Sequence, residues 1–149
     1  MLNIKTIISF LIFLSIIFSN KNFNLISKTE TQISVGFKLE NYSIDKIDGE
    51  DFIFLDGKSS SIDENLLFST FINIDPDLEY NILFDQSSIN SYNFQNNSYA
   101  TNLSESYYDI KEHFMRGRKI IELIINPFRF NNDLNKVGVI DEISINIEL

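Results

Sequence analysis

The chain has 149 residues, which suffices for one domain with a hydrophobic core but hardly for two. Its formal net charge of −9 repels phosphate groups and argues against nucleic-acid binding. It contains no cysteine, which excludes both a disulfide framework and a thiol nucleophile.

Residues 1–19 are predicted to form a secretory signal peptide. Met1–Lys5 carries one lysine, and the apolar run Ile7–Phe18 is shorter than the roughly 20 residues that a spanning helix needs. An uncleaved membrane anchor is the alternative. We therefore expect an exported protein that is periplasmic, cell-surface or secreted, makes no membrane contact beyond the signal peptide, and has a β-domain over residues 27–149.

The first predicted strand is Gln32–Leu39, where apolar residues occupy every second position. A second strand, Tyr42–Ile47, is followed by Asp48-Gly49, a residue pair favoured in tight hairpin turns. Phe52–Leu55 then returns as a third strand. A polar, serine-rich loop is expected over Lys58–Asn65.

The middle of the chain predicts further strands at Leu66–Ile74 and Tyr80–Phe84. Asp75-Pro76-Asp77 should end the first of them, because proline cannot donate to a ladder. Gln86–Ser106 is rich in serine and asparagine and is expected to be a long surface loop. The segment Asp109–Met115 is compatible with one helical turn.

The last third of the chain, Phe114–Leu149, predicts two long strands folded back on each other as a hairpin. Arg116-Gly117-Arg118 opens it and Pro127 interrupts it. Its end alternates apolar and polar residues with period two, the apolar ones being Ile143, Ile145, Ile147 and Leu149. With 14 phenylalanines and 6 tyrosines favouring strands, we expect an all-β fold. The architecture predicted is a β-sandwich or small open barrel of roughly seven to nine antiparallel strands.

No catalytic site is predicted. The single histidine, His113, has no serine elbow to serve and cannot build a typical zinc site by itself, so a loop or strand-edge position is favoured. The acidic cluster lacks the spacing of a calcium loop, so a charged hairpin turn is the stronger interpretation. Its members are Asp45, Asp48, Glu50 and Asp51. No cofactor, metal or catalytic residue is therefore expected.

A basic group, Arg116, Arg118 and Lys119, stands out in this acidic protein. One interpretation is that these charges satisfy nearby carbonyls or carboxylates where a strand begins. The other is that they form a basic finger presented to an acidic partner. Gly117 favours a kink or bulge that aims one arginine outward. These three residues are the candidate partner-binding site.

Several of these segments resemble, in order, the propeptide of gingipain-type cysteine peptidases. The Arg-Gly step at Arg116, the element Pro127–Asn131 and the alternating last strand carry most of the resemblance. Upstream, Gly36–Asp56 is similar to the early strand pair of that family, and Leu66–Phe84 is similar to its later strand ending in proline. The resemblance covers most of the chain after the signal peptide.

The resemblance implies a secreted β-sandwich prodomain that assists folding of a cysteine peptidase and masks its active site until it is removed. The peptidase domain, which a cysteine-free chain does not contain, would be the partner in cis or in trans. Such proteins often use type IX secretion. Arg116 or Arg118 would fill the specificity pocket if the enzyme cleaves after basic residues.

The alternative is a non-catalytic cell-surface β-sandwich that binds a partner protein or a glycan. Its support is the aromatic-rich stretch Tyr92–Tyr108, which includes Phe94, Tyr99 and Tyr107. An enzyme in its own right is the third and weakest reading.

Overall fold

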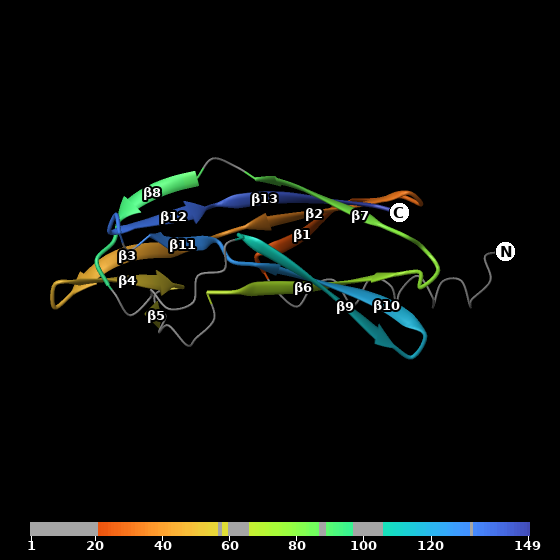
Figure 1. The fold of residues 1–149 in the computed structure, drawn as a ribbon, viewed down its shortest axis with the longest axis horizontal. Helices are drawn as coiled ribbons and strands as arrows, with labels where there is room; N and C mark the ends of the chain where they lie inside the picture. The colour runs from red at the N-terminus through yellow and green to blue at the C-terminus, as the bar shows by residue number, and fades with distance from the viewer. Residues whose placement is uncertain (1–20, 57, 60–65, 87–88, 97–105, 132) are drawn as a thin grey trace.

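The computed structural model describes residues 21–149 apart from 57, 60–65, 87–88, 97–105 and 132 (Figure 1). This part of the chain contains thirteen strands, which pair into four antiparallel sheets. No helix long and apolar enough to cross a membrane occurs among these residues. The predicted signal peptide, residues 1–19, lies outside them. Each sheet is named below after its central strand.

The β13 sheet has the strand order β1-β2-β13-β7. Its strands are β1 (Phe23–Lys28), β2 (Gln32–Lys38), β13 (Glu142–Glu148) and β7 (Asn81–Gln86). The alternation predicted at the end of the chain is confirmed, because Ile143, Ile145 and Ile147 are buried whereas Ser144 and Glu148 are exposed. This sheet therefore presents one apolar face to the interior.

The β10 sheet has the order β6-β10-β9. Its strands are β6 (Phe68–Ile74), β10 (Arg118–Ile125) and β9 (Tyr108–Met115). Ile121, Leu123 and Ile125 of β10 are fully buried, so alternate residues of this strand face the interior.

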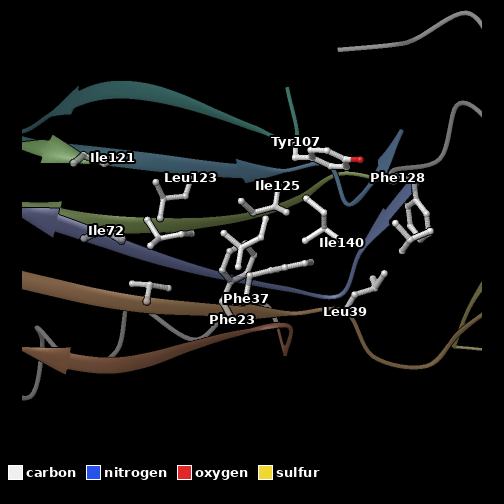
Figure 2. Close-up of a cluster of buried hydrophobic side chains, with 14 of the residues drawn as sticks. Phe23, Phe37, Leu39, Ile72, Tyr107, Ile121, Leu123, Ile125, Phe128 and Ile140 are labelled. Atoms are coloured by element: carbon white, nitrogen blue, oxygen red, sulfur yellow. The ribbon is translucent and has the colours of Figure 1, made fainter. Parts of the chain in front are cut away.

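The β13 and β10 sheets stack face to face. The ring of Phe68 lies 5.4 Å from that of Phe37, and the ring of Tyr108 stacks on Phe84 with 3.6 Å between centroids. Figure 2 shows the side chains of Leu123 and Ile125 on the side of β10 that faces Phe37. These contacts between the two sheets form the core of a sandwich.

Two smaller sheets complete the other half of the molecule (Figure 1). The β4 sheet consists of β3 (Tyr42–Ile47), β4 (Glu50–Leu55) and β5 (Lys58–Ser59), and the β12 sheet of β11 (Phe128–Asn131), β12 (Lys136–Ile140) and β8 (Ile89–Asn93). An edge-on contact between Tyr42 and Phe128, with ring centroids 5.9 Å apart, joins them. The predicted all-β, sandwich-like fold is confirmed, although the predicted number of strands was too low.

The predicted terminal hairpin of two long strands is wrong. β10 pairs with β6 and β9, β12 with β11 and β8, and β13 with β2 and β7. The chain breaks at Pro127, which has no N–H for a ladder, and again at Asp141. Each break lets the chain pass from one sheet to another, so the two predicted strands are four strands in three sheets.

Three other segments differ from expectation. Asp109–Met115 belongs to strand β9 and is not a helical turn. The predicted loop Gln86–Ser106 contains β8, whose polar sequence is held in a sheet by its pairing with β12. The predicted loop Lys58–Asn65 begins with β5, which pairs with β4. Within these loops, residues 60–65, 87–88 and 97–105 lie outside the described part of the chain.

Strand β1 is absent from the sequence prediction. Its register shifts between Leu25 and Ser27, so a bulge interrupts its alternation and leaves Ile26 57% exposed. β1 begins at Phe23, ahead of residue 27 where the β-domain was expected to start.

Candidate partner-binding hairpin

The candidate basic residues lie at the tip of the β9–β10 hairpin. Met115 pairs with Arg118, so the connection consists of Arg116 and Gly117. Their φ angles of +51° and +73° place both residues in the left-handed region, as in a type I′ turn. The structure therefore replaces the kink or bulge predicted at Gly117 by a tight hairpin turn.

This tip extends beyond the neighbouring strand. β6 ends at Ile74, which pairs with Lys119, so the last pair of the hairpin and its turn reach past the end of β6 (Figure 1). Phe114 is 69% exposed and Met115 is 60% exposed. Neither residue was predicted from the sequence as part of the candidate site, although both directly precede the Arg116-Gly117 step.

The side chain of Lys119 contacts two residues between β6 and β7. Its ammonium group donates a hydrogen bond of 2.8 Å to the carbonyl of Leu78 and lies 5.6 Å from the centroid of the Tyr80 ring. The hydroxyl of Tyr80 in turn donates to the carboxylate of Glu112 on β9. For Lys119 the structure therefore supports the first interpretation, a charge that satisfies a carbonyl where a strand begins.

Burial, reinforced by the hydrogen bond to Glu112 and by its negative charge, raises the pKa of Tyr80 to about 12. The phenol therefore stays protonated at neutral pH. It can act as the donor that ties the β9–β10 hairpin to the segment preceding β7.

Arg116 and Arg118 differ from Lys119. Both are exposed, and within the described ranges neither guanidinium group has an ion-pair partner. With Asn73, Met115 and Ile120 they line a hollow of about 400 Å³ beside the turn. The tip therefore combines two unpaired positive charges with exposed apolar side chains, a combination suited to a protein partner.

Asn73 lines this hollow, and its side-chain oxygen is buried without a hydrogen-bond partner among the described residues. A buried acceptor without a donor costs free energy. Sequence reasoning did not find Asn73, because it comes from β6 and reaches the tip only through its pairing with Ile120.

His113 lies on the edge strand β9, as predicted. Its Nε2 atom is 2.8 Å from the Glu122 carboxylate, and its ring centroid is 6.3 Å from that of Phe71. These three residues come from three adjacent strands on the outer face of the β10 sheet. His113 therefore interacts with residues of the two neighbouring strands of its sheet.

The acidic cluster forms the β3–β4 hairpin and its surroundings. Asp48 and Gly49 make the predicted turn, with φ angles of +53° and +91°. Asp51 is not solvated, however: it is 6% exposed, its carboxylate accepts the backbone N–H of Gln95 at 2.7 Å, and Lys46 lies 3.1 Å away. In the residues that the structure describes, no three His, Asp or Glu side chains are grouped as a metal site requires.

The aromatic stretch that supported glycan binding contains both exposed and buried rings in its described part, with Tyr92 39% exposed and Tyr108 38% exposed at its two ends. Phe94 and Tyr107 are buried, and Tyr99 lies outside the described residues. A sugar ring stacks on an exposed aromatic face, and the rings of Phe94 and Tyr107 do not offer one.

No protein-family model and no curated protein matches the sequence. The solved structures that are similar to the fold include the following two. One is a complex of the pro- and mature domains of RgpB from Porphyromonas gingivalis, with 13% identity, a TM-score of 0.54, and coverage of 87% of this chain and 84% of the other. The second concerns the zymogenic latency of gingipain K from the same organism, with 12% identity, a TM-score of 0.50, and coverage of 89% and 96%. The predicted resemblance to gingipain-type prodomains is thus confirmed at the level of the fold.

Proposed function

We propose that the chain is a non-catalytic, prodomain-like module that binds a cysteine peptidase domain, in cis or in trans, and keeps it latent. The fold supports this function, since the similar structures are a pro–mature complex and a zymogen. Folding assistance for the peptidase belongs to the same proposal. So does export behind a signal peptide at residues 1–19, to the periplasm, the cell surface or the medium, by a type IX route.

The observation that carries the proposal is the tip of the β9–β10 hairpin. Its two arginines are exposed and, among the described residues, unpaired, while Phe114 and Met115 offer apolar area beside them. A two-residue turn holds the tip in one conformation, which lowers the entropy lost on binding. If the peptidase cleaves after basic residues, Arg116 or Arg118 would occupy its specificity pocket.

The test uses residues 20–149 and a purified gingipain-type cysteine peptidase that cleaves after arginine. We expect inhibition of peptide hydrolysis and direct binding. Replacing Arg116 and Arg118 together by alanine should raise the inhibition constant at least about tenfold, as expected for hot-spot arginines.

The matched control is the double change Lys21→Ala and Lys38→Ala. It removes the same amount of charge from two exposed ion pairs away from the hairpin, and such pairs contribute little. Inhibition that survives the loss of both arginines would contradict the pocket-filling mechanism. Absence of both binding and inhibition would contradict the prodomain function itself.

A further inference from the structure

A second candidate site lies on the outer face of the β12 sheet, at the end of the molecule away from the β9–β10 turn (Figure 1). Arg129 pairs with Gly138, Asn131 with Lys136, and Gly138 with Ser91. Residues that pair directly, or that lie two apart in a strand, share one face of a sheet. These five residues therefore face the same way, and with Tyr107 they line a hollow of about 260 Å³.

The absence of a side chain at Gly138 leaves space for Tyr107, which forms part of the wall of the hollow. A Cβ atom at this position would lie 2.9 Å from the hydroxyl oxygen of Tyr107 and 3.2 Å from a side-chain carbon of Ile89. Tyr107 can therefore lie across the sheet only because Gly138 has no side chain. Burial raises the pKa of Tyr107, and the charge of Arg129 opposes this shift, so the phenol remains a neutral donor at neutral pH.

Arg129 is positioned by Tyr107. Its guanidinium carbon lies 5.0 Å from the centroid of the ring, in a cation–π contact. Such a contact attracts the charge to the ring without using a hydrogen-bond acceptor, so the guanidinium group retains N–H donors for a ligand. A guanidinium held this way presents a planar fork of donors that matches a carboxylate.

The positive charges of this hollow have no ion-pair partner among the described residues. The chain carries 21 aspartates and glutamates, yet neither Arg129 nor Lys136 forms an ion pair with any carboxylate in the part of the chain that the structure describes. In so acidic a protein, two adjacent unpaired cations make a local region of opposite charge. Asn131 adds a donor, because its side-chain oxygen accepts the N–H of Leu134 at 3.1 Å and its amide nitrogen has no acceptor among the described residues.

We propose that this hollow binds a carboxylate side chain of an acidic peptide segment, held by the Arg129 fork, the Lys136 charge and the Asn131 amide. Its volume is below the range of about 300–1,000 Å³ typical of small-molecule pockets, which fits a single side chain. Tyr107 is only 7% exposed, so its ring offers no free face on which a sugar could stack. This site is independent of the proposed peptidase contact, since none of its residues belongs to the hairpin.

The test is an NMR titration of ¹⁵N-labelled residues 20–149 with an acetylated and amidated Gly-Glu-Glu-Gly peptide. We expect saturable shifts of the backbone amides of Arg129, Asn131 and Lys136, and of the Arg129 side-chain N–H. Arg129→Gln and Lys136→Gln should each weaken binding about tenfold, because each removes a charge-assisted hydrogen bond. Both residues are exposed, so these variants should keep the native spectrum.

Three controls make the result decisive. Lys111→Gln removes an exposed cation from β9 and should leave binding unchanged. The same peptide with glutamine in place of glutamate should not bind. Glucuronate presents a carboxylate on a sugar, and its binding in place of the peptide would overturn the assignment. Absence of peptide binding, equal binding of the glutamine peptide, or an equal loss in Lys111→Gln would also overturn it.

Discussion

Arg118 and Lys119 are adjacent in the chain, yet they face opposite sides of β10. Lys119 turns inward to the Leu78 carbonyl, whereas Arg118 shares the outer face with Ile120. Strand geometry requires this separation, because successive side chains alternate between faces. Adjacent basic residues in a strand therefore lie on opposite faces of the sheet, where one contacts the rest of the protein and the other is exposed to solvent. Only the exposed residue is available to a partner.

The Tyr80 hydroxyl, which lies on the same side of the sheet as Lys119, makes the stability of the protein depend on pH. The folded-state pKa of about 12 lies above the ordinary value of about 10 expected in the unfolded chain. Stabilisation by the protonated phenol is therefore complete below about pH 10 and is lost as the pH rises toward 12. We expect Tyr80→Phe, which keeps the ring under Lys119, to lose less stability than the parent protein between pH 10 and 12. Urea unfolding across this range measures the difference, and parallel curves would contradict it.

At the scale of elements, the two hairpin turns differ in how well their residues suit them. Both have positive φ at both central residues, but one is Asp48-Gly49 and the other is Arg116-Gly117. Aspartate and asparagine tolerate the left-handed region, whereas arginine occupies it at a cost. The turn sequence at the tip of β9–β10 is therefore not optimised for stability.

We predict that Arg116→Asn stabilises the protein by about 0.5–1 kcal/mol while weakening peptidase binding. The stability change follows from a better turn residue, and the binding change from the lost guanidinium. Chemical denaturation and the inhibition assay measure the two effects separately. Asp48→Asn is the control and should change neither. A less stable Arg116→Asn variant would contradict the argument.

Local elements could be predicted from the sequence, but their partners could not. The strand Tyr42–Ile47 and its Asp48-Gly49 turn were predicted correctly, because the alternation of apolar residues and the residue types of a turn depend only on neighbouring residues. The alternation of β13 indicates a buried face but does not say that β2 and β7 flank it. At the candidate site, the sequence predicted a kink or bulge at Gly117 that aims one arginine outward, whereas the structure has a tight turn there and both arginines are exposed. The contribution of Asn73 depends on a strand more than forty residues away and could not be predicted.

At the scale of the whole molecule, the fold depends on pairing between distant parts of the chain. Gln32 pairs with Glu148 and Lys38 with Glu142, so β13 lies beside β2 although more than one hundred residues separate them in the chain. β13 also pairs with β7 on its other side. Such long-range contacts form only after a large loop-closure cost, which is typical of slowly folding β-proteins. The last strand of the chain is therefore central to the structure.

This role of β13 predicts unequal effects at two adjacent positions. Ile145 is fully buried between Val35 of β2 and Phe84 of β7, whereas Ser144 is exposed on the other face. We expect Ile145→Ala to reduce the free energy of unfolding by about 2–5 kcal/mol, because it leaves a cavity in the core. Ser144→Ala should change it by less than about 0.5 kcal/mol.

The chain has no disulfide that could add stability. The loss expected for Ile145→Ala is therefore a substantial part of the roughly 5–15 kcal/mol that stabilises an ordinary domain. Urea unfolding followed by circular dichroism measures both variants against the parent protein. If the two replacements cost the same, the buried face of β13 would not be what holds the β13 sheet against the β10 sheet.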